Sequence, residues 1–239
     1  MARLFDNNAA NYMSRAACNL GLNGLTECSF ACWINITATV ANEQAPLMKQ
    51  IGTGSEWGTV NIYVNSGTSV ILLSVQNRTL GQWPAWATNA GIDTGAWARV
   101  LFAWKRNAIN ATDGIVYING QAVSTTFTAN GYAVGFTMEE DSNTLFYGQA
   151  TPMTRQLNAA LDWVCVWNRQ LTAQEVLLDY TNPRNVTNGL VSRVRLGGTD
   201  ADEAYGGNMT VNGTLRDVSG NVPIRAGAHR SMFQSVNWE

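Results

Sequence analysis

Short runs in which apolar and polar residues alternate are the feature that most limits how this chain folds. In the run 59–65, an extended backbone would place Val60, Ile62 and Val64 on one face, because side chains alternate between the two faces of a strand. Further apolar or alternating runs are 30–36, 70–75, 99–105, 115–118 and 162–168. Strand-like runs at this spacing, with little helix between them, favour an all-β sandwich over a fold of alternating strands and helices.

Local signals add one hairpin and one helix. Asn119-Gly120 lies between two β-type segments, and both residue types tolerate the positive φ of a two-residue hairpin turn. Thr172 is followed three residues later by Glu175, which is the spacing of a helix-capping box. Pro183 disfavours helix at the residue before it. We therefore expect one short helix over 172–180.

Composition excludes several classes of protein. The 239 residues are 46% hydrophobic and 13% charged, which is enough apolar material for one large core. The net charge is −2 without a basic run, so nucleic acid is not an expected partner. No stretch reaches the roughly 18 apolar residues of a membrane span. The first residues lack the apolar segment of an export signal, so we expect synthesis and folding in a reducing cytoplasm.

The four cysteines, Cys18, Cys28, Cys32 and Cys165, are expected to be thiols in that compartment. Cys28 and Cys32 have the spacing of half a metal site, but His229 is the sole histidine and lies far along the chain. A zinc site needs four ligands of these types, and the sequence therefore favours buried thiols over a metal.

Four segments, in order along the chain, resemble the laminin-G-like jelly-roll family, in the group that includes pentraxins and legume-type lectins. These segments are 2–6 with 30–34, 97–104, 114–120, and 146–148 with 160–176. The resemblance implies a two-sheet antiparallel jelly-roll sandwich of the concanavalin A type, with the short helix after its last long strand. A partial match continues through 189–221, so we expect a domain over 1–221 and a C-terminal tail over 222–239.

The same resemblance raises two kinds of site that the residues do not support. Glucanases share this fold and need two facing carboxylates, but the acidic clusters Glu139-Glu140-Asp141 and 200–203 are interpreted as solvated loop charges. The lone His229 lacks a nucleophile motif. The family also implies calcium, for which Asp93, Asp113 and Asp141 are loop candidates without a calcium motif. We therefore expect no enzyme activity and no cofactor.

Tryptophan supplies the candidate binding residues. Five tryptophans fall in strand patterns and are expected in the core; they are Trp33, Trp97, Trp104, Trp163 and Trp167. Trp83 and Trp86 flank Pro84 in a segment that resists regular pairing. Their indoles could form a platform for sugar rings, anchor a protein interface, or fold over a sheet end. Trp57 is a third ligand-binding candidate because it does not follow the alternation.

Two functions remain open at this stage. The first is a non-enzymatic structural or decoration protein of a bacteriophage virion, because the domain begins directly after Met1 and its opening resembles those of phage particle proteins. Its apolar tail residues Met232, Phe233 and Trp238 would then dock on a neighbouring protomer or on the major capsid protein, unless the tail packs on its own sandwich. Homo-oligomers are expected, and the virion is the expected location. The alternative is a lectin or adhesin for a cell-surface glycan, with a glycoside hydrolase as the third reading.

Overall fold

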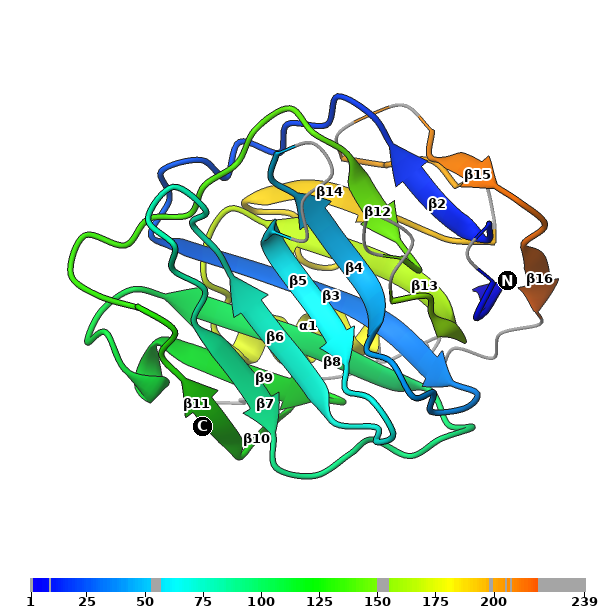
Figure 1. Ribbon diagram of the computed structural model, residues 1–239, viewed down its shortest axis with the longest axis horizontal. Coiled ribbons are helices and arrows are strands. Elements are labelled where there is room, and N and C mark those ends of the chain that lie inside the picture. The colour runs from blue at the N-terminus through cyan, green and yellow to red at the C-terminus, as the bar shows by residue number, and fades with distance from the viewer. Residues whose placement is uncertain are drawn as a thin grey trace, which may run out of the picture.

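The structure is a computed structural model that describes residues 2–8, 10–52, 57–149, 155–197, 200–204, 206 and 208–218. Two antiparallel β-sheets pack face to face in it (Figure 1). The prediction of an all-β, two-sheet sandwich is confirmed.

Eight strands of the described chain form the first sheet, in the order β10-β9-β8-β3-β13-β1-β16, with β14 also paired to β13. Their bounds are β1 Ala2–Asp6, β3 Glu27–Ile36, β8 Ala98–Lys105, β9 Gly114–Ile118, β10 Gln121–Val123, β13 Asn158–Trp167, β14 Leu190–Val194 and β16 Arg216–Val218. A 3-10 turn, Ala111–Asp113, precedes β9. Because β14 and β16 pair with β13 and β1, residues beyond the predicted helix belong to the same sandwich.

The second sheet has the order β11-β7-β6-β5-β4-β12-β2-β15, again among described residues. Its strands are β2 Tyr12–Arg15, β4 Gln44–Gln50, β5 Gly58–Val64, β6 Ile71–Val75, β7 Ala85–Thr88, β11 Thr125–Thr128, β12 Leu145–Tyr147 and β15 Thr210–Asn212. Strands β4, β5 and β6 lie in its middle and face the viewer in Figure 1.

The main core fills the space between the sheets. Val60, Ile62 and Val64 of β5 are buried there, opposite Val100 and Phe102 of β8 in the same cluster. The alternation that predicted these strands therefore also predicted which side of each strand is buried. The Asn119-Gly120 hairpin is confirmed as well, since both residues have positive φ (53° and 79°) and β9 pairs with β10.

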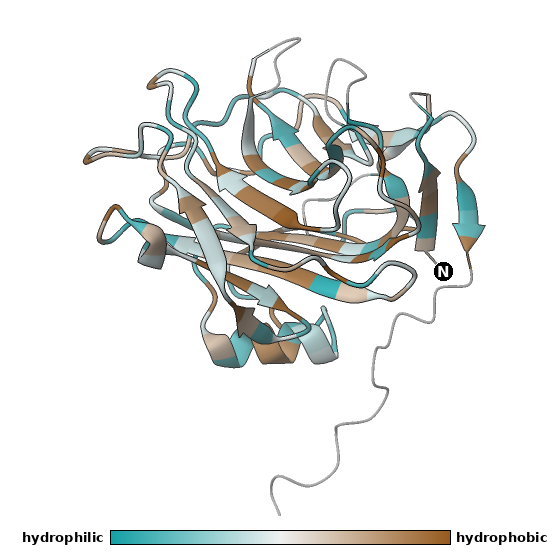
Figure 2. Cartoon of the chain, turned by 60° about the horizontal axis from the view of Figure 1, so that its bottom comes forward, coloured by the Kyte–Doolittle hydropathy of each residue, from teal (hydrophilic) through white to brown (hydrophobic). Residues whose placement is uncertain are grey.

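The described residues contain one α-helix, α1, Ala173–Thr181. Thr172 caps it through the predicted capping box with Glu175. The helix lies on the outer face of the first sheet (Figure 2), where Val176 packs with Leu101 and Cys165. Asp179 of the helix accepts two hydrogen bonds of 2.8 Å from the buried Arg99 of β8. Its length falls far short of a membrane span, and no helix among the described residues meets that requirement.

Burial of the cysteines and tryptophans largely follows the sequence prediction. All four cysteines are buried free thiols, and burial raises the pKa of the Cys32 and Cys165 thiols to about 12. Four of the five tryptophans placed in strands are buried: Trp33, Trp104, Trp163 and Trp167. Trp97 is only half-buried, just before β8 begins.

Candidate functional site

The outer face of the second sheet carries polar and aromatic residues in its middle. Because Ile62 and Val64 point into the core, Asn61 and Tyr63 point outward from β5. The same rule on β6 places Leu73 in the core and Leu72 and Ser74 outside. Gln76 follows directly after this strand and lies on the same side. These outward residues form a floor beside which two loops supply further side chains.

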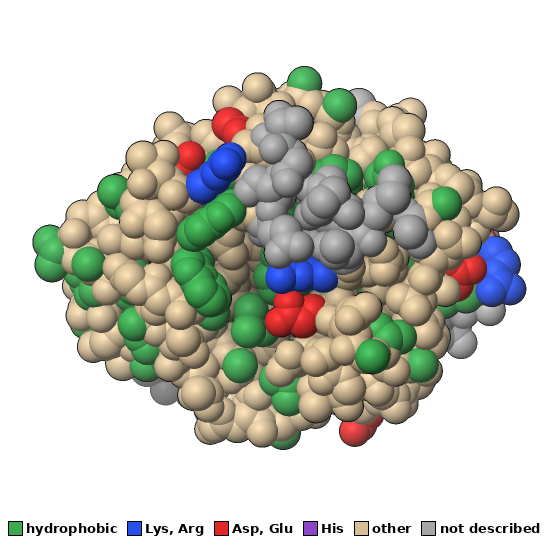
Figure 3. Space-filling view, viewed as in Figure 1, with side chains coloured by type: hydrophobic (Ala, Val, Ile, Leu, Met, Phe, Trp, Pro, Cys, Tyr) green, Lys and Arg blue, Asp and Glu red, His purple; other side chains and the backbone are tan. Residues whose placement is uncertain are grey.

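A groove of about 310 Å³ lies over this floor, at the lower end of the roughly 300–1,000 Å³ common for ligand sites. Its aromatic residues are Trp57, Tyr63 and Trp83, and its other described lining residues are Glu43, Leu72, Ser74, Gln76 and Arg155. Figure 3 shows this face hollowed between a band of hydrophobic side chains and a neighbouring pair of basic and acidic ones. Such a combination can contact apolar and polar parts of one ligand together.

Hydrogen bonds fix the floor. Tyr63 Oη donates to Asn61 Oδ1 at 3.1 Å, and Asn61 Nδ2 donates to Ser74 Oγ at 3.3 Å. Gln76 Nε2 donates to the same Ser74 oxygen at 3.2 Å, while Gln76 Oε1 accepts from Gly58 N at 2.9 Å. Since these side chains are buried and hydrogen-bond to one another, the floor is held in one arrangement.

Charged residues form one wall. Arg155 Nη2 lies 3.2 Å from Glu43 Oε2, and the Arg155 guanidinium carbon lies 4.7 Å from the centre of the Tyr63 ring. The backbone of Arg155 has a φ of 105°, a conformation that residues with a side chain rarely adopt. The guanidinium is thus held over the aromatic floor and beside a carboxylate.

The structure brings two of the three predicted ligand-binding tryptophans together. Trp57 and Trp83 line the groove, and Trp83 is 45% exposed. The assignment of Trp86 to the same platform is wrong. Trp86 is fully buried on β7, packs on Phe102 and donates its indole N–H to the Ala111 carbonyl. The reason is that the strand begins directly after Pro84, so the alternation of β7 turns the indole into the core.

Three residues that line the groove were not predicted from the sequence, for different reasons. Tyr63 could have been found, because it alternates with core residues in the run 59–65 and so had to face outward. Glu43 and Arg155 come from segments distant in sequence with no motif, and only the folded sheet brings them together. The predicted interface residues Met232, Phe233 and Trp238 lie outside the described residues.

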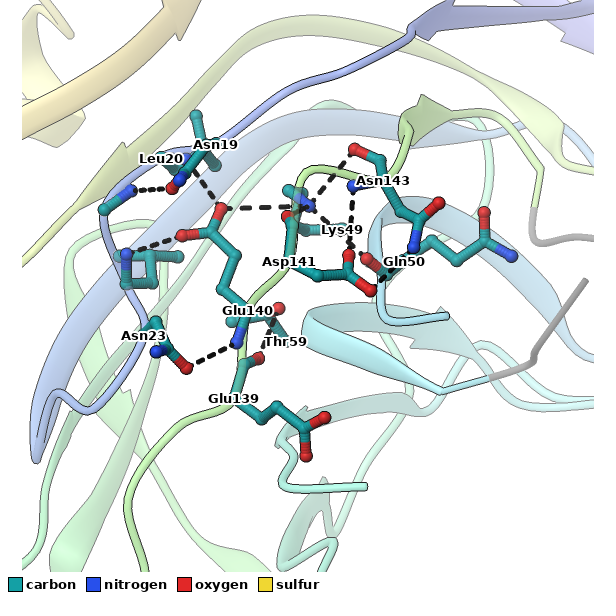
Figure 4. Close-up of polar contacts among 12 residues, drawn as sticks. Asn19, Leu20, Asn23, Lys49, Gln50, Thr59, Glu139, Glu140, Asp141 and Asn143 are labelled. Carbon is teal, nitrogen blue, oxygen red and sulfur yellow. Dashed lines mark hydrogen bonds and ion pairs between the residues drawn. The ribbon is translucent and has the colours of Figure 1, made fainter. Parts of the chain in front are cut away.

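Beside the groove, a buried polar network joins three segments of the chain (Figure 4). Glu140 accepts hydrogen bonds of 2.6 Å from the backbone N–H groups of Leu20 and Leu22, and it lies 3.8 Å from Lys49 Nζ. Lys49 donates to the carbonyl oxygens of Asp141 at 2.9 Å and Asn143 at 3.2 Å. Burial lowers the pKa of Lys49, and Glu140 opposes that shift.

The network reaches the groove through its neighbours. Asp141 accepts from Gly52 N at 2.7 Å, and Ile51 N donates to the Trp57 carbonyl at 2.8 Å. Glu139 N donates to the Gln76 carbonyl at 3.1 Å. The network therefore supports the backbone at both Trp57 and Gln76.

The interpretation of the acidic clusters as solvated loop charges is wrong for their main members. Glu140 is 8% exposed, and its two oxygens are used as described above. Asp200 and Asp202 are also buried, the first paired with Arg3 and the second with Arg15. These carboxylates bind residues that are distant in sequence. The residues next to them in the sequence therefore gave no sign of their burial.

The calcium candidates do not fit a calcium site. Asp113 accepts from three backbone N–H groups, those of residues 107–109, and from Tyr132 Oη at 2.6 Å. Burial raises its pKa, but these hydrogen bonds outweigh that effect and lower it. Asp141 is engaged with Gly52 and Asn143, and Asp93 is exposed on a loop. Across the described residues, no three His, Cys, Asp or Glu side chains gather closely enough to hold a metal.

Comparison with known proteins places the fold. Residues 7–177 match the model of the concanavalin A-like lectin/glucanases superfamily. A solved structure of a protein from Bacteroides ovatus, proposed to bind carbohydrate, is 14% identical with a TM-score of 0.65, over 92% of this chain and 60% of that one. A heptameric pentraxin from Limulus polyphemus is 13% identical with a TM-score of 0.56, over 87% and 95% of the two chains.

At these identities the two structures show a shared fold. The chain spans less than two thirds of the Bacteroides ovatus protein. No curated protein sequence matches it.

Proposed function

The chain belongs to the concanavalin A-like lectin/glucanases superfamily, and we propose that it is a non-catalytic carbohydrate-binding protein whose ligand lies in the groove of Trp57 and Trp83. One observation carries the proposal. Two tryptophans and a preorganised polar floor line the same groove.

The chemistry of a sugar matches this lining. A pyranose ring has faces of C–H groups that pack on aromatic rings and an edge of hydroxyl groups that need hydrogen-bond partners. Tryptophan offers a large rigid apolar surface at low conformational cost. The amide, hydroxyl, guanidinium and carboxylate groups of the groove supply both donors and acceptors.

The groove is less suited to hydrolysis. Glycosidases use a pair of carboxylates, about 5 to 9.5 Å apart, on either side of the scissile bond. Glu43 is the single carboxylate among the described lining residues, and Arg155 pairs with it at 3.2 Å. A binding protein needs no second carboxylate, so the lining favours binding over catalysis. The fold shared with a protein proposed to bind carbohydrate supports the same choice.

A binding assay with two groove variants tests the proposal. Wild type, Trp57→Ala and Trp83→Ala are screened on a glycan array, and affinities for the best ligands are measured by calorimetry. We expect each substitution to weaken binding at least about tenfold, which corresponds to about 1.4 kcal/mol. Trp97→Ala is the matched control, because Trp97 lines a different hollow, together with residues 88–93, 96, 98, 118, 119, 123 and 124. Binding that survives both groove substitutions, or no binding to any glycan, would overturn the proposal.

A virion decoration role remains a separate prediction. It depends on the tail residues 222–239, on a homo-oligomer and on a capsid protein as partner, none of which the described residues address. The mass of the purified protein in solution tests the first step: a defined oligomer agrees with it, and a monomer up to millimolar concentration contradicts it. Carbohydrate binding in the groove is compatible with either result.

A further inference from the structure

The floor of the groove presents hydrogen-bond donors that lack acceptors. Ser74 Oγ accepts from both Asn61 Nδ2 and Gln76 Nε2, at 3.3 and 3.2 Å, which uses the two lone pairs of a hydroxyl oxygen. The Ser74 hydroxyl proton has no acceptor among the described residues, although Ser74 is 1% exposed and lines the groove. A buried donor without a partner is unfavourable, so a ligand that supplies an acceptor here gains affinity.

Gln76 places a second hydrogen-bond donor beside Ser74. Its Oε1 accepts from Gly58 N at 2.9 Å, which fixes the orientation of the amide and directs Nε2 toward Ser74. Nε2 carries two protons, and Ser74 takes one of them. The two residues therefore offer donors, not acceptors, at adjacent positions on one face of the sheet.

An apolar side chain lies next to these donors. Leu72 precedes Ser74 by two residues on the same face of β6, a separation of roughly 7 Å along a strand. Leu72 also lines the groove. The ligand group that fits this pair of neighbours has an acceptor oxygen without a proton and, beside it, a small apolar part.

We propose that the preferred ligand, within the carbohydrate binding proposed above, is a neutral N-acetylated sugar. The carbonyl oxygen of the acetamido group accepts from Ser74 Oγ and Gln76 Nε2, and its methyl group packs on Leu72. A sugar hydroxyl at the same place would also accept, but its own proton would face two donors. An acetamido oxygen carries no proton and avoids that conflict.

Charge points to a neutral sugar. Arg155 and Glu43 are the charged residues among those described in the lining, and they pair with each other. An acidic sugar would have to compete with Glu43 for the guanidinium. A neutral sugar leaves the pair intact and can bridge it with one hydroxyl group.

Two oligosaccharides with one backbone test the inference. The tetramers of β-1,4-linked N-acetylglucosamine and β-1,4-linked glucose differ only in the group at C2. We expect the acetylated tetramer, or N-acetylgalactosamine against galactose in a parallel pair, to bind at least tenfold more tightly in calorimetry. Equal or weaker binding of the acetylated member in both pairs would overturn the inference, also where some other glycan binds well.

A variant isolates the donor itself. Ser74→Ala removes the acceptor of Asn61 and Gln76 in the floor and so weakens both ligands, but it should lower affinity for the acetylated ligand at least fivefold more than affinity for its non-acetylated partner. Ser14→Ala is the control, because Ser14 lies on β2 of the same sheet outside the groove. Equal losses for both ligands would contradict the assignment of Ser74, whereas an absence of all glycan binding would remove the proposed function as well.

Discussion

Replacing Glu140 with Gln should destabilise the fold strongly, although a single oxygen is exchanged. Glu140 is buried, and its oxygens each accept a backbone N–H at 2.6 Å. The amide keeps one acceptor but turns an NH2 group toward the other N–H donor. Lys49, which is fully buried, loses the carboxylate 3.8 Å from its ammonium group.

The size of the effect follows from these contacts. Removing one partner of a buried ion pair costs about 3–5 kcal/mol because the other charge stays buried. A hydrogen bond to a charged group contributes about 1.5–3 kcal/mol, and this term overlaps with the first. We therefore expect a loss of about 3–5 kcal/mol, which for a domain of this size lowers Tm by on the order of 10 °C.

Urea unfolding followed by tryptophan fluorescence measures this loss. Glu139→Gln is the matched control, because the neighbouring carboxylate accepts from Thr79 N at an exposed position, where the expected change is within about 1 kcal/mol. A loss below about 1 kcal/mol in Glu140→Gln would refute the assignment of Glu140 as a buried structural carboxylate.

Two further predictions concern stability. Burial raises the pKa of Asp162 to about 6, so the native state binds this proton more tightly than the unfolded state, and stability falls as pH rises from about 4 to about 6. Asp162→Asn should therefore be more stable than wild type by up to about 3 kcal/mol at pH 8. At pH 4 the two proteins should be nearly equally stable. Unfolding curves that give the same difference in stability at both pH values would contradict this. Thr172→Ala removes the hydroxyl that accepts from Glu175 N and should cost about 1 kcal/mol, seen as a Tm lower by about 2–4 °C in calorimetry, and an unchanged Tm would show that the cap contributes nothing.

Features set by residues close in sequence were predictable. Asn119-Gly120 forms its hairpin because positive φ is a local property of these residue types. The helix at Ala173–Thr181 forms where Thr172 and Glu175 satisfy its first N–H groups. The core-facing positions of β5 and β8 followed from alternation alone. On β13 the main core instead takes Val164 and Val166, and Trp167 packs on the helix side.

Features that depend on distant partners were not predictable. In the sequence Glu140 has the neighbours of an exposed loop charge. Only the fold brings Lys49 and the backbone N–H of Leu20 next to its carboxylate. The prediction for Trp86 was wrong because Pro84 lies just before strand β7 and does not interrupt it. Arg155 and Glu43 meet only because β4 begins near the segment before β13. The two tryptophans of the groove could thus be predicted from the sequence, and its two charged residues could not.

Fluorine NMR of protein labelled with 5-fluorotryptophan tests the central claim most directly, since tryptophans among the described residues lie in both sheets and in the groove. Addition of a neutral oligosaccharide should shift the resonances of Trp57 and Trp83 along one saturation curve and leave those of the buried Trp86 and Trp104 in place. A shift confined to Trp97, or no shift at saturating ligand, would contradict a carbohydrate site in this groove.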